Sequence, residues 1–444
     1  TDSRTEKRVE LHAHTQMSTM DSVVPIEMLI STAEQYGHSA VAITDHGVIQ
    51  AFPTAQKLTR KSKIKVIYGM EGYLFDEDIS RSYHIIILAR NTIGLRNLYR
   101  LVSLSHIKYF HRTPRIPRSA LVEFREGLIL GSACEAGELY RAMLNGASVD
   151  DLSRIASFYD YLEIQPCGNN EFLIRNGEVS GVRELQELNR KICEIGRING
   201  KPVAATCDVH FLRPDDEVYR RILMSGQKYD DADLQAPLYF RTTEEMLAEF
   251  SYLGDELAEE VVVRTPRRIA DSVEKLQPIP DNLYSPDIPG ADDDIRNMSY
   301  DRAHQLYGEP LPEIVAERLR MELNSIINNG FGVLYLIAHK LVKKSTDDGY
   351  LVGSRGSVGS SFVATMTGIT EVNPLPPHWR CPECQYSEFA DPGAFGGGFD
   401  LPDKLCPHCG ANLKKDGHNI PVAVFLGFEG DKVPDINLNF SGDY

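Results

Sequence analysis

The segment RVELHAHT at residues 8–15 decides the fold and the chemistry that we expect of this chain. Successive side chains of an extended strand point to opposite faces, so its apolar residues share one face while His12 and His14 share the other. Two imidazoles on one face can bind the same metal ion. We therefore expect a buried strand that presents metal ligands.

Six further apolar or β-branched runs follow, and helical patterns separate them. They are SAVAITDHG at 39–47, KVIYGMEG at 65–72, YHIIILAR at 83–90, GLILGSACEAG at 127–137, YDYLEIQP at 159–166 and PVAATCDVHFL at 202–212. Seven strands that alternate with helices predict a parallel α/β barrel or a wound sheet.

Side chains of the kind that bind metals stand at the ends of these runs, where the loops of a barrel converge. They are Asp21 in the loop after the first run, Asp45 and His46, Glu71, Cys134, Asp208 and His210. His84 fits this pattern less well because it precedes its apolar run. A mixture of imidazoles and carboxylates suits Zn²⁺, Mn²⁺ or Fe²⁺ better than Ca²⁺. Bridged ions of this kind bind a phosphate ester and activate a water molecule for hydrolysis.

The composition limits the partners of the chain. Its 444 residues suggest two or three domains. With 47 Lys and Arg against 63 Asp and Glu, the formal net charge is −16, so any contact with nucleic acid has to be local. No run approaches the ~20 apolar residues of a membrane span, and the first residues TDSRTEKRVEL lack the apolar stretch of a signal peptide. We therefore expect a cytoplasmic protein with reduced thiols and no membrane contact.

Shifts in composition divide the chain into three expected parts. Residues 1–225 contain the barrel, and residues 226–290 form an acidic helical connector that runs into the Pro- and Asp-rich stretch LQPIPDNLYSPDIPGADDD. Residues 291–444 open with two amphipathic helices separated by a break at 330–332.

Four of the eight cysteines form two C-x-x-C pairs. Cys381 and Cys384 belong to the first pair, and Cys406 and Cys409 follow after a spacer of 21 residues. Two such knuckles predict a zinc ribbon, here within an insert at 378–412. Four thiolates complete a tetrahedron around Zn²⁺ and leave no position for water, so we expect a structural role.

The stretch YLVGSRGSVGSSFVATMTG at 350–368 predicts a strand, a Gly/Ser loop and a helix. Free backbone N–H groups at the start of such a helix favour an anion. The loop has no G-K-[ST] and is not a P-loop, and Arg355 is its only cation. From the residues alone, a phosphate site and a flexible turn fit this pattern equally well.

The stretch KVPDINLNF at 432–440 predicts a strand with two different faces. Its apolar side chains share one face, while Asp435, Asn437 and Asn439 share the other. The polar face can present ligands to a metal ion.

These motifs together resemble a known family. LHAHT with the Asp21 that follows, TDHG, GMEG, YHIIIL, GSACEAGE and CDVHF are similar to the polymerase-and-histidinol-phosphatase (PHP) domain of bacterial C-family replicative DNA polymerases, and most similar to the PolC type. The resemblance implies an α/β fold, namely a PHP-type (β/α)7 barrel that holds up to three metal ions. The ligands that it implies are His12, His14, Asp21, His46, Glu71, His84, Cys134, Asp208 and His210.

The last part of the chain resembles the N-terminal part of an α+β polymerase palm domain that carries a zinc ribbon. The residues that the resemblance places against the phosphates of the incoming nucleotide are Gly353, Ser354, Arg355, Gly356 and Ser357. In the family, two aspartates two residues apart bind the Mg²⁺ ions of nucleotidyl transfer. Asp435 matches the first aspartate, whereas Asn437 stands at the second position and lacks the charge that Mg²⁺ prefers.

The function that the resemblance implies is template-directed DNA synthesis by a replicative polymerase, with primer–template DNA and dNTPs as substrates. The sliding clamp and other replisome proteins are expected to bind regions absent from this chain. PolC-type chains normally carry a proofreading exonuclease between the strands of Glu71 and His84, where this chain has only GYLFDEDISRSY. Two alternatives stay open: a PHP-type metal-dependent phosphoesterase or 3′–5′ DNA exonuclease, and a scaffold that metals stabilise.

Overall fold

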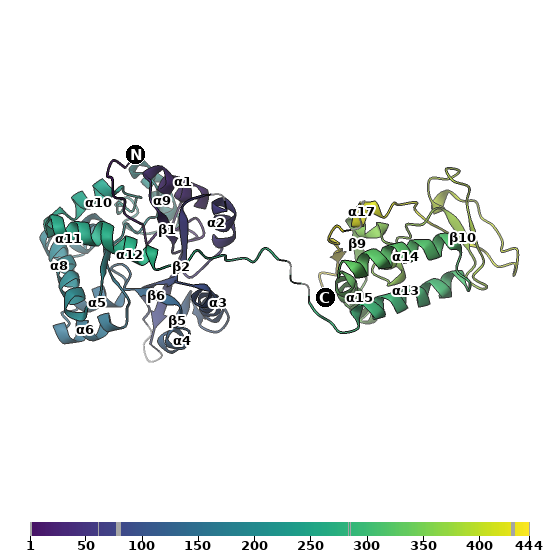
Figure 1. Cartoon of the computed structure of the whole chain (residues 1–444), viewed down its shortest axis with the longest axis horizontal. Helices are drawn as coiled ribbons and strands as arrows, with labels where there is room; N and C mark the ends of the chain where they lie inside the picture. Colours follow the sequence, from purple (N-terminus) through teal and green to yellow (C-terminus); the bar gives the residue numbers. More distant parts are fainter. Residues whose placement is uncertain are drawn as a thin grey trace. The chain divides into compact units, whose positions relative to one another are not determined.

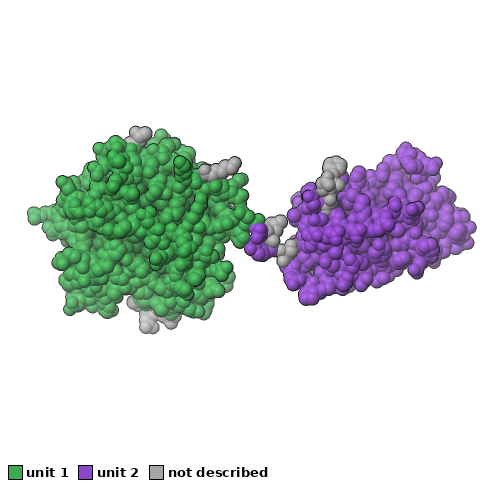
Figure 2. Space-filling view, in the orientation of Figure 1, with its two compact units in different colours: residues 1–281 green, residues 282–444 purple. Residues whose placement is uncertain are grey.

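The computed structural model describes residues 2–60, 62–76, 81–282, 284, 286–427 and 431–443. The chain divides into two compact units, unit 1 (Thr1–Asp281) and unit 2 (Asn282–Tyr444), shown in Figure 1 and coloured separately in Figure 2. Each unit has its own hydrophobic core. No helix in the described ranges is long and apolar enough to cross a bilayer.

Unit 1 is built around a closed barrel of seven extended segments. Its strands are β1 (Ala40–Ile43), β2 (Lys65–Phe75), β3 (Tyr83–Ala89), β6 (Leu128–Gly131), β7 (Leu162–Ile164) and β8 (Val203–Ala205). The seventh segment, residues 10–13, joins its neighbours by two isolated bridges, Glu10 to Val41 and Ala13 to Val209. A bridge from Gly131 to Tyr161 connects β6 to β7, so the ring closes. The predicted α/β barrel is thereby confirmed.

Strand β3 runs against the direction of its neighbours. It pairs antiparallel with both β2 and β6, whereas β1 with β2 and β7 with β8 are parallel. The expectation of a wholly parallel barrel is therefore wrong. Only residues 76–82 join β2 to β3, and a parallel crossover needs about a dozen residues or more. The reversal sets His84 opposite Tyr73, close to the position of Glu71 on β2.

Helices surround the barrel (Figure 1). Up to residue 213 they are α1 (Ile26–Tyr36), α2 (Phe52–Thr59), α3 (Thr92–Ile107), α4 (Arg118–Glu123), α5 (Glu138–Leu144), α6 (Val149–Ser157), the 3-10 turn η1 (Cys167–Asn170), α7 (Glu171–Arg175) and α8 (Val182–Asn199). Their apolar stripes face inward; in α8, Leu185, Ile192 and Ile195 are buried. The short strands β4 (Phe110–His111) and β5 (Thr113–Pro117) extend the sheet beside β2.

Residues 214–281 also belong to unit 1. Their elements are η2 (Pro214–Asp216), α9 (Glu217–Gly226), α10 (Thr243–Glu249), η3 (Ser251–Leu253), α11 (Asp255–Glu259), the π-helical η4 (Glu260–Arg264) and α12 (Thr265–Asp271). Phe240, Met246 and Phe250 are fully buried in the barrel core. These apolar side chains need cover, so the segment expected as a connector packs on the barrel as far as Asp281.

Unit 2 combines a helical core with two small sheets. Helices α13 (Ala291–Tyr307), α14 (Glu313–Asn328) and α15 (Gly332–Asp347) pack with the short α16 (Phe362–Met366) around one core. The break between α14 and α15 confirms the predicted interruption at 330–332, where Gly330 has a φ of 71°.

The two sheets of unit 2 carry the remaining motifs. Strand β9 (Gly353–Arg355), followed by the 3-10 turn η5 (Gly356–Ser360), pairs antiparallel with β13 (Asn437–Asn439). The second sheet has the order β11 (Ser387–Phe389), β10 (His378–Arg380), β12 (Lys414–Asp416). The short helices η6 (Gly398–Asp400) and α17 (Ala423–Leu426) complete the unit.

Candidate metal centres and phosphate loop

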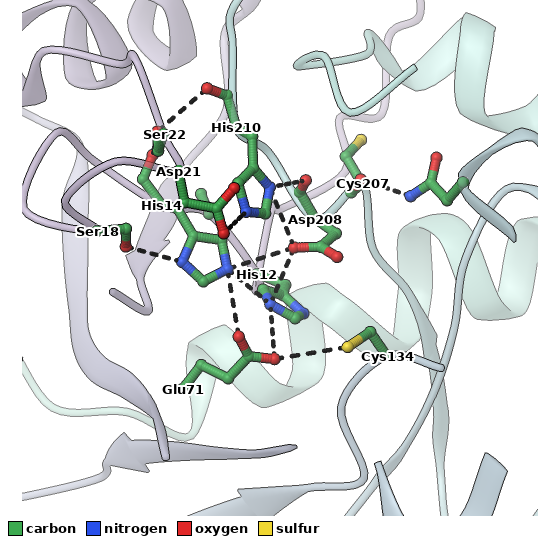
Figure 3. Close-up of polar contacts among 12 residues, drawn as sticks. His12, His14, Ser18, Asp21, Ser22, Glu71, Cys134, Cys207, Asp208 and His210 are labelled. Carbon is green, nitrogen blue, oxygen red and sulfur yellow. Dashed lines mark hydrogen bonds and ion pairs between the residues drawn. The ribbon is translucent and has the colours of Figure 1, made fainter. Parts of the chain in front are cut away.

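The structure brings together the nine residues expected to form a metal cluster in the barrel, and Figure 3 shows seven of them labelled. The nine are His12, His14, Asp21, His46, Glu71, His84, Cys134, Asp208 and His210. His84, which the spacing of the sequence could not place, reaches the cluster because β3 is antiparallel.

The inner part of the cluster is buried. His12 and His14 are 0% exposed, and their Nε2 atoms lie 3.1 Å apart. Asp208 Oδ1 lies 3.2 Å from Nε2 of His12 and 3.3 Å from Nε2 of His14. Glu71 adds its two carboxylate oxygens at 3.4 and 3.6 Å from the same two nitrogens. Nitrogen and oxygen atoms of four side chains therefore converge on one point.

The outer part of the cluster surrounds Glu71 and Asp21. His46 Nδ1 lies 2.8 Å from Glu71 Oε2, and its Nε2 lies 3.1 Å from Asp21 Oδ2. His84 Nδ1 lies 3.0 Å from Glu71 Oε1 and 3.5 Å from Cys134 Sγ. The outer residues are less buried than the inner pair, and a cavity of about 210 Å³ opens against them.

Burial and charge act against each other in this cluster. Burial alone lowers the pKa of His12, but the Asp208, Glu163 and Glu71 carboxylates outweigh it and raise that pKa well above its usual value. Burial together with the nearby His46 lowers the pKa of His14 to about 3. For His46, burial is outweighed by Glu71, and its pKa rises to about 10. The cluster therefore requires cations, which are either protons on the imidazoles or metal ions.

The donor atoms fit metal ions. Three groups have ligand atoms that all lie within 4.8 Å of one another: His12 with His14 and Glu71, His14 with His46 and His210, and His46 with Glu71 and His84. The groups share members, so ions bound there would lie close together. Imidazole nitrogens and carboxylate oxygens suit Zn²⁺, Mn²⁺ and Fe²⁺.

Two residues that support the cluster were missed in the sequence. Glu163 Oε1 lies 2.6 Å from His12 Nδ1, and Arg220 of α9 donates from Nε and Nη2 to Asp21 Oδ1 at 3.1 and 2.5 Å. A charged residue between Leu162 and Ile164, both buried, was the available signal for Glu163. Arg220 carries no such signal, because its partner lies 199 residues away.

The four ribbon cysteines lie together in unit 2. Cys381 Sγ is 3.4 Å from Cys409 Sγ, and Cys384 Sγ is 3.5 Å from Cys406 Sγ. All four sulfur atoms lie within 4.8 Å of one another. These distances exceed the ~2.05 Å of a disulfide and approach the roughly 3.8 Å expected between thiolates around one Zn²⁺ with ~2.3 Å bonds. The cysteines therefore fit a tetrahedral zinc site.

The Gly/Ser loop, whose residues 353–357 are expected to hold phosphates, lies beside the strand expected to bind Mg²⁺. In the pairing of β9 with β13, Arg355 is opposite Asn437 and Gly353 is opposite Asn439. Directly paired residues point to the same face, so the Arg355 and Asn437 side chains share a face of this sheet. Arg355 and Asp435 are exposed. A loop with a cation thus lies beside a strand that Asp435 precedes by two residues.

The expectation that the N–H groups at the start of α16 are free is wrong. Phe362 N and Val363 N donate to the two oxygens of Glu322, each at 3.0 Å, and Ser361 Oγ donates to Glu322 Oε2 at 2.9 Å. Glu322 comes from α14, is 0% exposed, and forms an ion pair with Arg318. A protein carboxylate therefore fills the anion position at this helix start, and phosphates would have to contact residues 353–357 instead.

The Glu322→Ala substitution should lower the free energy of unfolding of unit 2 by roughly 3–5 kcal/mol, because it removes the carboxylate of a mostly buried ion pair with Arg318 and the acceptor of the Phe362 and Val363 N–H groups. Urea unfolding of the 444-residue chain measures the effect. Glu317→Ala on the same helix is the control, since the Glu317 side chain is 62% exposed and its exposed ion pair contributes less than about 1 kcal/mol. Equal losses from the two variants would contradict the capping role of Glu322.

Comparisons with known families agree with this architecture. Residues 10–166 match the PHP domain, and residues 293–444 match the bacterial DNA polymerase III alpha NTPase domain. The barrel of unit 1 is therefore a PHP domain.

Curated relatives identify the family. "DNA polymerase III PolC-type" of Clostridium perfringens is 43% identical over 644 residues and covers 100% of this chain and 44% of the relative. The protein of the same name from Bacillus subtilis is 57% identical over 368 residues, with 82% of this chain and 26% of the relative covered. The chain belongs to the PolC-type DNA polymerase III family, as the sequence motifs predicted.

The chain spans less than half the length of these relatives. The alignment with the Clostridium protein runs over 644 positions, about 200 more than the 444 residues of this chain. Among solved structures, an amidohydrolase from Chromobacterium violaceum with bound sulfate matches 46% of this chain and 87% of its own, with 13% identity and a TM-score of 0.29.

Proposed function

We propose that this chain is part of a replicative DNA polymerase of the PolC type, which synthesises DNA on a template by two-metal nucleotidyl transfer. The observation that carries the proposal is the pairing of β9 with β13, which joins the Gly/Ser loop to the strand that begins at Asn437, two residues after Asp435. The names of the relatives support the same activity. Primer–template DNA and dNTPs are then the substrates.

Each residue of this surface has a distinct role in the proposal. Arg355 and the backbone of residues 353–357 hold the phosphates of the incoming nucleotide, with a charge-assisted hydrogen bond from the guanidinium. Asp435 and the side chain at position 437 hold Mg²⁺, which when bound stabilises charge on the reacting phosphoryl group. Asn437 keeps an oxygen ligand but lacks the negative charge, so this chain is expected to bind Mg²⁺ weakly.

The test is primer extension by a chimera in which residues 1–444 are followed by the remaining C-terminal regions of the Clostridium perfringens relative. With Asn437 present we expect little extension, because two-metal transfer lacks one carboxylate. Asn437→Asp should raise the rate on the order of 10²–10³-fold, the size of effect seen when one preorganised charge-stabilising group is removed from an active site.

The chain of 444 residues by itself provides the control. With a net charge of −16, it should hold duplex DNA poorly at physiological salt, so neither it nor its Asn437→Asp variant should extend a primer. In the chimera, Asp435→Asn should abolish the gain from Asn437→Asp. A chimera that is equally active with either residue at 437 would rule out the proposed roles of this strand.

The cluster in the barrel favours a second candidate, metal-dependent hydrolysis of phosphoesters by the PHP domain. The nine converging ligands and the cavity of about 210 Å³ beside them support it. Zn²⁺, Mn²⁺ or Fe²⁺ held there would activate a water molecule. Release of nucleotides from 3′-labelled DNA in Mn²⁺, lost on His12→Ala, would separate a 3′–5′ exonuclease from a metal-stabilised scaffold.

The additional positions in the Clostridium relative support one further part of the proposal. We place the missing proofreading exonuclease between Glu71 and His84, at the short connection of β2 to β3. The sliding clamp and other replisome proteins are proposed to bind regions outside this chain.

A further inference from the structure

His12 and His14 present the same ring nitrogen to the centre of the barrel cluster. Their Nε2 atoms are 3.1 Å apart, and both face Asp208 Oδ1 at 3.2 and 3.3 Å. When each neutral ring carries its hydrogen on Nδ1, these three atoms offer only lone pairs to one another. Such an arrangement is stable in a buried site only around a cation.

The outward-facing nitrogens of the two rings have different partners. Nδ1 of His12 lies 2.6 Å from the carboxylate oxygen Oε1 of Glu163. Nδ1 of His14 lies 3.1 Å from Ser18 Oγ, and the Ser18 hydroxyl donates to Asp45 Oδ1 at 2.8 Å. Both partners accept a hydrogen from Nδ1, but only His12 contacts a carboxylate directly.

Glu163 is itself held firmly on β7. Its Oε1 accepts from Thr206 Oγ1 at 2.8 Å and from Gln165 Nε2 at 3.2 Å, and its backbone N donates to Ser132 Oγ at 2.9 Å. Glu163 is 2% exposed, and its Oε2 has no hydrogen-bond partner among the described residues. The ring nitrogen of His12 is the only cationic or potentially cationic group hydrogen-bonded to this carboxylate in the described ranges.

We propose that Glu163 is a positioning residue of the PHP metal centre, an inference that rests on the proposed metal role of the cluster. Its carboxylate keeps the hydrogen of His12 on Nδ1 and so directs the Nε2 lone pair at the ions. It also makes His12 a stronger ligand than His14, whose outer nitrogen contacts a neutral hydroxyl. Removing a residue that hydrogen-bonds the non-ligating nitrogen of a metal-binding histidine lowers metal affinity by roughly 10–100-fold.

The test is Mn²⁺ binding by the full chain and its Glu163→Gln and Glu163→Ala variants, measured by titration calorimetry. Mn²⁺ is the probe because the soft thiolates of the ribbon do not select it. Glu163→Gln keeps an acceptor oxygen near Nδ1 and loses the charge, so Mn²⁺ affinity should fall by about 10-fold. Glu163→Ala loses both, and the affinity should fall by up to roughly 100-fold.

Two further variants separate positioning from general damage. Glu259→Gln is the matched control: this mostly buried carboxylate pairs with Arg4 at 2.9 Å in the same unit and should leave Mn²⁺ affinity unchanged. Ser18→Ala should lower the affinity less than Glu163→Gln does. Circular dichroism checks folding, and the near-isosteric glutamine variant keeps the test usable if the alanine variant does not fold.

The outcomes distinguish this inference from the proposed metal role itself. If Mn²⁺ affinity is unchanged within twofold in the folded Glu163 variants but is lost in His12→Ala, the metal centre stands and the positioning role of Glu163 is wrong. If His12→Ala also leaves Mn²⁺ binding unchanged, the metal role of the cluster fails. A graded loss from wild type to glutamine to alanine supports both.

Discussion

Cys406→Ser should release zinc from the ribbon and unfold the sheet of β10, β11 and β12. The local core beside the cysteines is small and consists of a few side chains such as Trp379, Leu401 and Leu413. A core of this size cannot replace a structural Zn²⁺ ion, whose binding contributes about 10–16 kcal/mol in zinc-finger peptides. Elemental analysis after gel filtration should find one zinc fewer per chain, and amide hydrogen exchange should rise across residues 378–416.

Cys193→Ser is the control for this prediction. Cys193 lies half-buried on α8 in unit 1 and takes no part in the cysteine cluster, so its replacement should leave the zinc content unchanged. In the unaltered protein, bound zinc should protect Cys381 and Cys406 from alkylation. Free alkylation of both residues, or full zinc content in Cys406→Ser, would rule out the ribbon site.

The grouping of the residues in both clusters could be predicted because it follows from local rules. A period of two put His12 and His14 on one face, and the carboxyl ends of neighbouring strands brought Glu71 and Asp208 to the same edge. The ribbon followed from the two C-x-x-C pairs, since a knuckle is complete within a few residues. In these cases the residues that form the pattern are also the residues that lie together in the structure.

The supporting contacts could not be predicted, because each joins residues that are remote in the sequence. Glu163 meets His12 across 151 positions, and Glu322 meets the start of α16 across about 40. A strand pattern reports which face is buried but carries no information about which strand lies beside it. The direction of β3 differs from these contacts because the sequence contains its signal: the connection from β2 is too short for a parallel crossover.

The Glu322 carboxylate at the start of α16 limits how the Gly/Ser loop at 353–357 can bind an anion. A helix start that is free would bind phosphate through its backbone N–H groups, and any side chain in the loop would be secondary. Glu322 already accepts from two of those N–H groups, so the cation of Arg355 becomes the main attraction for an anion at this surface. The loop is therefore expected to depend on Arg355 more strongly than its glycine-rich sequence suggests.

His12→Ala should remove most of the stability that unit 1 gains from metal ions. The imidazole is 0% exposed and contacts the Asp208, Glu71 and Glu163 carboxylates, so its loss leaves buried negative charge with fewer ligands to hold a cation. A ligand at 100 times its Kd stabilises the native state by about 2.7 kcal/mol. For a unit of this size, that corresponds to a rise in Tm of roughly 5–10 °C.

The measurement is the Tm of unit 1 with saturating Mn²⁺ and after EDTA treatment, in the wild type and in His12→Ala. The substitution also damages packing, but that damage is present in both conditions, so the difference between the two Tm values isolates the contribution of the metal. The wild type and the control His111→Ala, an exposed histidine on β4, should both gain in Mn²⁺, whereas His12→Ala should gain little. Equal gains in all three proteins would mean that Mn²⁺ stabilises unit 1 from another site, and the cluster around His12 would then have no metal role.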